Sequence, residues 1–161
     1  MLEIALFALT VGLVQGDSAA PAGAPTTAAA PAAAFVPEDQ TPTGRFLTAT
    51  EVRPILDATR ANWISVREYN GQDLVYLTPL EAWRCGLHAV HYGLNGAPAT
   101  TPWEMEPCYV DEPQPNAIKA EGRVPYFAAA LGSVEEITVQ LTYDDGSIDT
   151  ARLSRLGQVL D

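Results

Sequence analysis

Residues 83–108 read Trp83-Arg-Cys85-Gly-Leu-His-Ala-Val-His-Tyr-Gly-Leu-Asn95-Gly96-Ala-Pro-Ala-Thr-Thr-Pro-Trp-Glu-Met-Glu-Pro-Cys108. Asn95-Gly96 predicts a type I′ turn, because both central residues of that turn need a positive φ. A tight hairpin around it would place Cys85 opposite position 106, whereas a loop longer by two residues brings Cys85 opposite Cys108. Their Cα atoms would then lie about 5.5 Å apart, the usual spacing of a disulfide. Because stable disulfides belong to oxidising compartments, we expect a periplasmic or secreted protein.

A second Asn-Gly pair, Asn70-Gly71, separates two β-rich runs, residues 63–69 and 72–78. A two-residue turn there pairs residues whose numbers sum to 141. One face of this hairpin is apolar and predicts a core: Ile64, Val66, Val75 and Leu77. The opposite face carries the candidate binding residues: Trp63, Arg67, Tyr69, Leu74 and Tyr76. This face either packs against a helix or binds a partner, since aromatic and arginine side chains are common in interaction hot spots.

The third predicted hairpin turns at Asp144-Asp145-Gly146. A three-residue loop with Gly146 in the left-handed region pairs Tyr143 with Ser147. That register gathers apolar side chains on one face: Ile137, Val139, Leu141, Ala151 and Leu153. Upstream, residues 50–62 predict one helix with Thr50 as its N-cap, Pro54 at its fourth position and Asn62 as its stop. Residues 109–131 are rich in proline, and the sequence leaves their conformation open apart from a short apolar patch from Tyr126 onward.

These elements predict a mostly β fold with a minor α component: antiparallel hairpins that form a small sandwich-like domain with one N-terminal helix. Residues 4–14 form an apolar run that is too short to span a bilayer and suits a signal peptide cleaved after residue 16. No lysine or arginine precedes the run, so a different start codon and a single buried strand are alternatives. Residues 17–44, rich in alanine and proline, predict a flexible tether, and residues 45–161 predict the folded domain.

The net charge of −11 excludes the basic footprint that binding to nucleic acid or to an anionic membrane requires, and it suits a monomer. No nucleotide-binding or hydrolase motif occurs, and we expect no cofactor and no metal. His88 and His91 are the only histidines. On a strand they would point to opposite faces, which argues against a metal site. Four acids near Cys108 either hold a cation weakly or form a solvated rim: Glu104, Glu106, Asp111 and Glu112.

Residues 90–98, with the strand that begins at Trp103, form a hairpin of tyrosine, small residues and Asn-Gly, and residues 139–146 form a similar edge hairpin. Together they resemble the immunoglobulin-like and fibronectin-like modules of bacterial secreted proteins. The resemblance covers about 45 residues and implies a β-sandwich. It transfers no functional residue, and the early helix departs from the all-β pattern of that group.

We therefore expect a non-enzymatic module that binds or stabilises another protein or an envelope component. Such a module would expose an apolar or aromatic patch and lack a concave polar pocket. The alternative is a small envelope hydrolase, which needs a cleft with His88 or His91 hydrogen-bonded to a carboxylate. A third interpretation is an acidic metal buffer.

Overall fold

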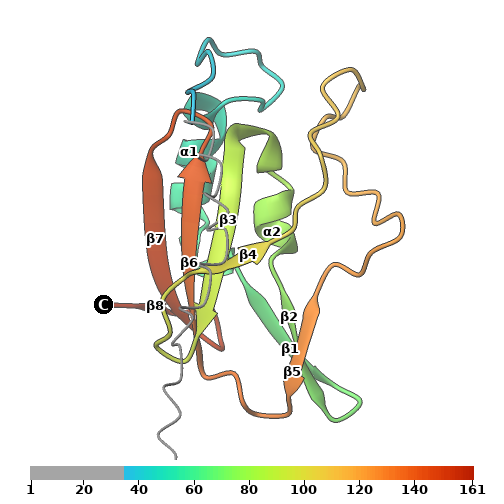
Figure 1. Cartoon of the computed structure of the whole chain (residues 1–161), viewed down its shortest axis with the longest axis vertical. Coiled ribbons are helices and arrows are strands. Elements are labelled where there is room, and N and C mark those ends of the chain that lie inside the picture. Colours follow the sequence, from blue (N-terminus) through green and yellow to red (C-terminus); the bar gives the residue numbers. More distant parts are fainter. Residues whose placement is uncertain (1–34) are drawn as a thin grey trace, which may run out of the picture. The chain divides into compact units, whose positions relative to one another are not determined.

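The strands expected around the three turns form two antiparallel sheets in the computed structural model, which describes residues 35–161 (Figure 1). The predicted signal peptide and tether up to residue 34 lie outside the described residues. The helical elements are α1 (Ala49–Ala58), η1 (Arg60–Asn62), α2 (Thr78–Glu81) and η2 (Arg84–Gly86). The strands are β1 (Ser65–Tyr69), β2 (Gln72–Tyr76), β3 (Leu87–Leu94), β4 (Thr101–Trp103), β5 (Phe127–Ala130), β6 (Glu136–Tyr143), β7 (Ile148–Ser154) and β8 (Val159–Leu160).

The smaller sheet has the order β1-β2-β5 and the larger sheet the order β4-β3-β6-β7-β8, which confirms the mostly β fold with one short N-terminal helix. Helix α1 lies against the larger sheet, behind β6 and β7 in Figure 1. The guanidinium of Arg53, a residue of α1, lies 4.3 Å from the centre of the Tyr143 ring at the end of β6. None of the helices in residues 35–161 is long and apolar enough to cross a membrane.

Two hairpin registers are as predicted. In the β1–β2 pair, Val66 faces Val75, so paired numbers sum to 141. In the β6–β7 pair, Val139 faces Ala151, and Gly146 adopts a φ of +84° in the three-residue loop. The expected apolar face of that hairpin is fully buried at Ile137, Val139 and Leu141, because it packs into the common core.

Helix α1 begins and ends earlier than predicted. Its N-cap is Thr48 rather than Thr50, so Pro54 is the sixth helical residue, and the helix ends before the short turn η1. The reason is Glu51, whose carboxylate accepts the backbone N–H groups of Leu47 (2.9 Å) and Thr48 (3.3 Å). Desolvation alone would raise the pKa of Glu51, but these N–H donors and those of neighbouring residues lower it to about 2.

Strand β5 lies in the stretch that the sequence left open. It pairs with β2, with Phe127 opposite Val75 and Ala130 opposite Gln72. A short alanine-rich edge strand has no period-two pattern of its own, so only its partner strand reveals it.

The two sheets are joined by one buried ion pair. Arg155, in the turn between β7 and β8, donates to both carboxylate oxygens of Asp73 in β2, at 3.0 and 2.9 Å. Asp73 is fully buried, and the guanidinium lowers its pKa. Because a bidentate pair fixes geometry as well as charge, this contact sets how the smaller sheet meets the larger one.

The folded part starts upstream of the predicted boundary at Arg45. The Glu38 N–H donates to the Asp144 carbonyl at 2.9 Å, and the Gln40 side chain donates to the Asp144 carboxylate at 2.9 Å. The same carboxylate accepts the N–H of Ala49, the first residue of α1, at 2.8 Å. Asp144 therefore anchors residues 38–43, which we call the rim segment, to the helix and to the larger sheet.

Candidate functional site

The predicted binding face of the β1–β2 hairpin is only partly a surface. Trp63 precedes β1, is 1% exposed, and donates its indole N–H to the Leu56 carbonyl at 2.9 Å, so it belongs to the core under α1. Leu74 is also buried, at 7% exposure. Of the two alternatives for this face, packing against the helix therefore holds for Trp63. Leu74 is buried in the middle strand of its sheet, between Arg67 of β1 and Ala128 of β5.

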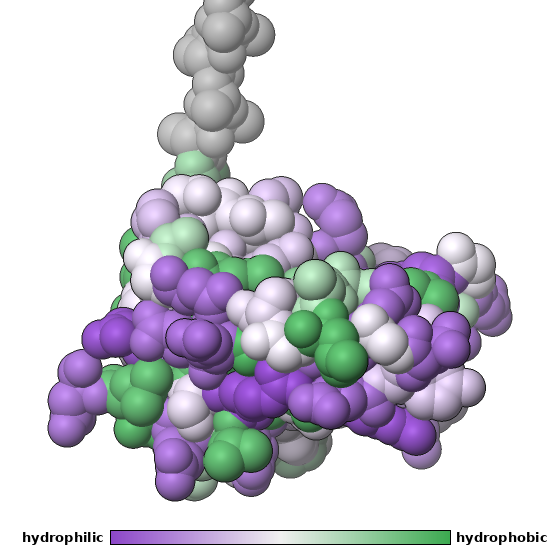
Figure 2. Space-filling view, turned by 90° about the horizontal axis from the view of Figure 1, so that it is seen from below, coloured by the Kyte–Doolittle hydropathy of each residue, from purple (hydrophilic) through white to green (hydrophobic). Residues whose placement is uncertain are grey.

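The other three predicted residues remain accessible on the smaller sheet. Tyr69 is 59% exposed, with the Arg67 guanidinium 5.4 Å from its ring centre. Tyr76 is half-buried and lies 5.3 Å from Tyr126, ring centre to ring centre. The end of the molecule seen in Figure 2 shows apolar groups scattered among polar ones rather than one broad apolar patch. The broad apolar patch expected of such a binding module is therefore absent from the end of the described domain that Figure 2 shows.

The second hairpin builds a concave site instead. The disulfide between Cys85 and Cys108 is present, with an S–S distance of 2.06 Å and a Cα–Cα distance of 5.0 Å. Val90 faces Trp103, so paired numbers sum to 193, as the longer loop requires. Between this hairpin and the rim segment lies an open groove of about 750 Å³. We call it the acidic groove; its lining includes Glu38, Asp39, His88, His91, Glu104 and the disulfide.

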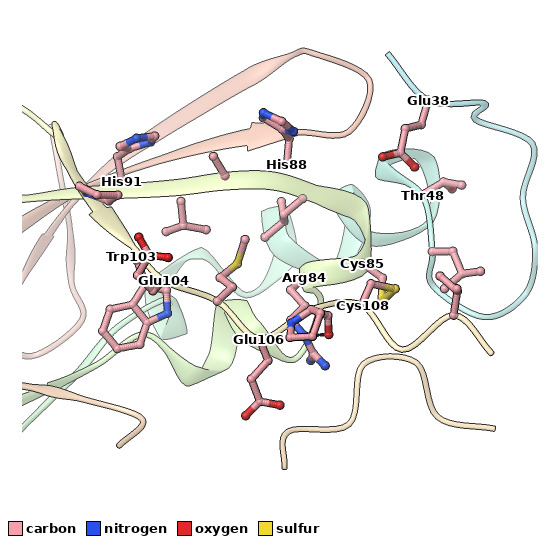
Figure 3. A pocket seen from close by; sticks show the side chains of 18 of the residues that line it. Glu38, Thr48, Arg84, Cys85, His88, His91, Trp103, Glu104, Glu106 and Cys108 are labelled. Carbon is pink, nitrogen blue, oxygen red and sulfur yellow. Dashed lines mark hydrogen bonds between the residues drawn. A yellow bond between two sulfur atoms is a disulfide. The ribbon is translucent and has the colours of Figure 1, made fainter. Parts of the chain in front are cut away.

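Both histidines line this groove, so the prediction that they point to opposite faces is wrong. A β-bulge between Leu87 and Ala89 makes His88 an extra residue in β3. The bulge lets Leu87 and Val90, three residues apart, both enter the core at 7% and 1% exposure. His88 and His91 are consequently left on the same side of β3, as Figure 3 shows.

Neither imidazole is held by a hydrogen bond from residues 35–161. The His88 ring is exposed and meets the Phe35 ring edge-on, with 4.5 Å between ring centres. His91 is half-buried in the sheet between Pro102 of β4 and Gln140 of β6. The hydrolase interpretation required a histidine bonded to a carboxylate, and the described residues form no such pair.

Three exposed carboxylates supply the charge of the groove: Glu38, Asp39 and Glu104. Within the described part of the chain none of them forms an ion pair. Hydrogen bonds from Thr41 lower the pKa of Asp39, which keeps that carboxyl ionised. In Figure 3 Glu38 lies near the His88 end of the groove, and Glu104 lies near the His91 end, across the β3 ribbon from the imidazole in this view.

Two charged residues that line the groove point away from it, as Figure 3 shows for Glu106 and Arg84. Glu106 is 8% exposed and accepts the N–H groups of Lys119 (2.9 Å) and Ala120 (2.6 Å) and the Tyr109 hydroxyl (3.1 Å). Burial alone would raise the pKa of Glu106, but these donors hold it below its usual value. Its carboxylate therefore binds the loop of residues 109–120 behind the groove and is not available to a ligand.

Arg84 is 2% exposed and binds five backbone carbonyls instead of a carboxylate. The acceptors belong to Glu81, Pro107, Pro115, Asn116 and Ala117, at 2.8 to 3.4 Å. A buried cation needs such partners to offset its desolvation. The guanidinium therefore fastens residues 107–117 beside the disulfide and makes that wall of the groove rigid, while contributing no accessible positive charge.

The accessible charge of the groove lining is negative. None of the serines lines it, the cysteines are oxidised, and no group of three metal-ligating side chains occurs among the residues that the structure describes. The lining includes three exposed carboxylates and two imidazoles around a space of about 750 Å³. Such a lining attracts positive charge.

The four-acid cluster predicted near Cys108 does not stay together. Glu106 lines the groove but is buried, Glu112 forms an ion pair with Lys119 at 2.6 Å, and of the four only Glu104 is an exposed acid in the groove lining. The sequence analysis missed Glu38 and Asp39, which no local pattern links to β3. The position of Glu104 could have been predicted. The register in which paired numbers sum to 193, continued by one residue, places Glu104 opposite Ala89, on the hairpin face that carries His91.

Comparison with known proteins assigns no relative. No family model matches the chain, no curated protein matches it, and no solved structure matches it. The resemblance to immunoglobulin-like and fibronectin-like modules therefore stays a prediction and assigns no role to any residue.

Proposed function

We propose that the protein is a monomeric, non-enzymatic binding module outside the cytoplasm, and that its acidic groove takes a positively charged segment of another protein or envelope component. The observation that carries this proposal is a set of three carboxylates, Glu38, Asp39 and Glu104, that form no ion pair within residues 35–161 and line a concave space in which those residues place no accessible cation. A lysine or arginine side chain entering there gains Coulomb energy from several carboxylates at once.

The rigidity of the groove walls supports the same proposal. One wall is held by the disulfide and by the carbonyl bonds of Arg84, and the rim segment is held by Asp144. A site that is already formed before binding loses little conformational entropy when it binds. The location rests on the disulfide and on the apolar run of residues 4–14, since both are typical of exported proteins.

The test is binding of a fluorescent octalysine peptide, followed by anisotropy at low salt and pH 7.5, with octaglutamate as the peptide control. We expect saturable binding of octalysine only. Glu38→Gln and Glu104→Gln should each weaken it about fivefold, because each removes one facing charge. The matched control is Glu135→Gln, which removes an exposed acid outside the groove and should change the affinity by less than about twofold.

Two outcomes would contradict the proposal. One is the absence of saturable octalysine binding. The other is an equal effect of Glu135→Gln and Glu104→Gln, which would mean that the peptide responds to the total charge of −11 and not to the groove.

A further inference from the structure

We propose that His88 and His91 release the cationic ligand when the surroundings become acidic. The inference rests on the proposed function and concerns the regulation of the same site. Its basis is geometric: the only two imidazoles of the chain lie on one side of β3, inside the acidic groove.

Neither ring is tied to the fold by a polar contact of the described residues. Neither donates or accepts a hydrogen bond among residues 35–161, and the one close partner of His88 is the neutral ring of Phe35 at 4.5 Å between centres. Protonation therefore breaks no bond that holds the fold. Imidazole is also the side chain that ordinarily gains its charge between about pH 8 and 5.

The exposed carboxylates that line the groove together with the imidazoles come from two elements. The rim segment supplies Glu38 and Asp39, and the chain after β4 supplies Glu104. The sheet neighbours of His91 are uncharged: Pro102 of β4 and Gln140 of β6.

Other charged groups close by are directed elsewhere. Arg84 binds backbone carbonyls, and Asp144 binds Gln40 and the start of α1. Asp145 forms an ion pair with Arg53 of α1 at 2.6 Å. The exposed lining of the groove within residues 35–161 therefore carries three negative charges when both histidines are neutral, and one when both are protonated.

A proton and a cationic ligand then compete for the same groove. Each imidazolium offsets one carboxylate and repels the ligand, so affinity falls as the pH drops. Thermodynamic linkage requires the reverse effect of equal size: bound ligand must make both imidazoles harder to protonate. Asp and Glu side chains ordinarily gain their proton only near about pH 4 to 5, below the range in which imidazole does.

The experiment measures octalysine binding at pH 7.5 and pH 5.5 with the full chain. With its α-amino group blocked by the fluorescent label, octalysine keeps its lysine charges at both values, so the change reports on the protein. We expect binding to the native protein to be roughly tenfold weaker at pH 5.5. For the His88→Gln/His91→Gln double variant, the ratio of the two affinities should be close to one. As a second readout, saturating octalysine should lower the pH at which the imidazole NMR signals of the native protein titrate.

The outcomes separate the two proposals. Binding at pH 7.5 that is unchanged at pH 5.5, or a pH dependence that survives in the double variant, overturns the histidine mechanism and leaves the binding function standing. The absence of octalysine binding at pH 7.5 overturns both.

Discussion

The β1–β2 and β3–β4 hairpins close on the same dipeptide, yet one is a flat strand pair and the other forms a wall of a groove. Asn70 and Gly71 have φ values of 50° and 76°, and Asn95 and Gly96 have 52° and 81°. The first turn leads directly into paired strands. After the second, residues 97–100 stay unpaired, which shifts the register by two residues. The dipeptide determines the turn, whereas the contacts beyond the turn determine the register.

Two features hold the shifted register of the β3–β4 hairpin. At its open end the disulfide joins Cys85 to Cys108. Near the turn, Gly93 lets the carbonyl groups of Ala97 and Pro98 lie where any other residue would have its Cβ atom. The β1–β2 hairpin has neither feature. The following predictions test this difference, from the largest expected effect to the smallest.

Replacing both cysteines, Cys85→Ser with Cys108→Ser, should lower the free energy of unfolding by about 3 kcal/mol, because the open chain gains conformational entropy. Urea unfolding measures the loss, and hydrogen exchange locates it. We expect the amides of β3 and β4 to lose protection before those of β1 and β2. Equal loss in both hairpins would mean that the disulfide does not hold the register.

Gly93→Ala should cost about 2 kcal/mol, because the new methyl group meets backbone carbonyls that cannot move without displacing residues 97–100. The matched variant is Gly71→Ala. There the methyl group meets nothing within 4 Å, and the cost of about 1 kcal/mol comes only from the positive φ of 76°. Octalysine affinity should fall for Gly93→Ala alone. If Gly71→Ala is the more costly of the two, close packing against Gly93 is not what sets the register.

Tyr76→Ala should cost about 1.5 kcal/mol, because the half-buried ring loses its contact with Tyr126. Tyr69→Ala should cost less than about 0.5 kcal/mol, because its ring is 59% exposed. Urea unfolding of both variants is the measurement. A loss of several kcal/mol in both would show that the face is core and is closed to any partner.

Arg67→Ala should have the smallest effect of the series. The guanidinium lies outside the acidic groove, so octalysine affinity should change by less than about twofold, against about fivefold for Glu104→Gln. A larger change for Arg67→Ala would mean that the β1–β2 face takes part in binding, as the sequence predicts.

Much of the larger sheet could be predicted from local signals. The alternation of Ile137, Val139 and Leu141 with polar residues, and a glycine at the left-handed position of the loop, were enough to assign the β6–β7 register. The start of α1 and the strand β5 could not be predicted from local signals. The first depends on Glu51 binding N–H groups in the preceding loop, and the second on pairing with β2 some fifty residues earlier.

The candidate site could be predicted only in part, for a related reason. The disulfide register is sufficient to place Glu104 beside His91 on one face. The position of His88 depends on the bulge, which arises because Leu87 and Val90 both enter the core. Glu38 is held at the groove by its backbone hydrogen bond to Asp144, which lies 106 residues later in the chain. No pattern in the intervening sequence predicts this contact.

The place of the disulfide within the chain has a consequence for proteolysis. Both cysteines precede the loop of residues 109–125, and β5 to β8 follow it. A protease that cuts this loop therefore yields two fragments that no covalent bond joins, and the second fragment carries β6, the middle strand of the larger sheet. The cross-link thus gives no protection at the longest connection of the molecule. There, resistance to cleavage depends on how firmly the Arg84 guanidinium and the Glu106 carboxylate keep the loop against the domain.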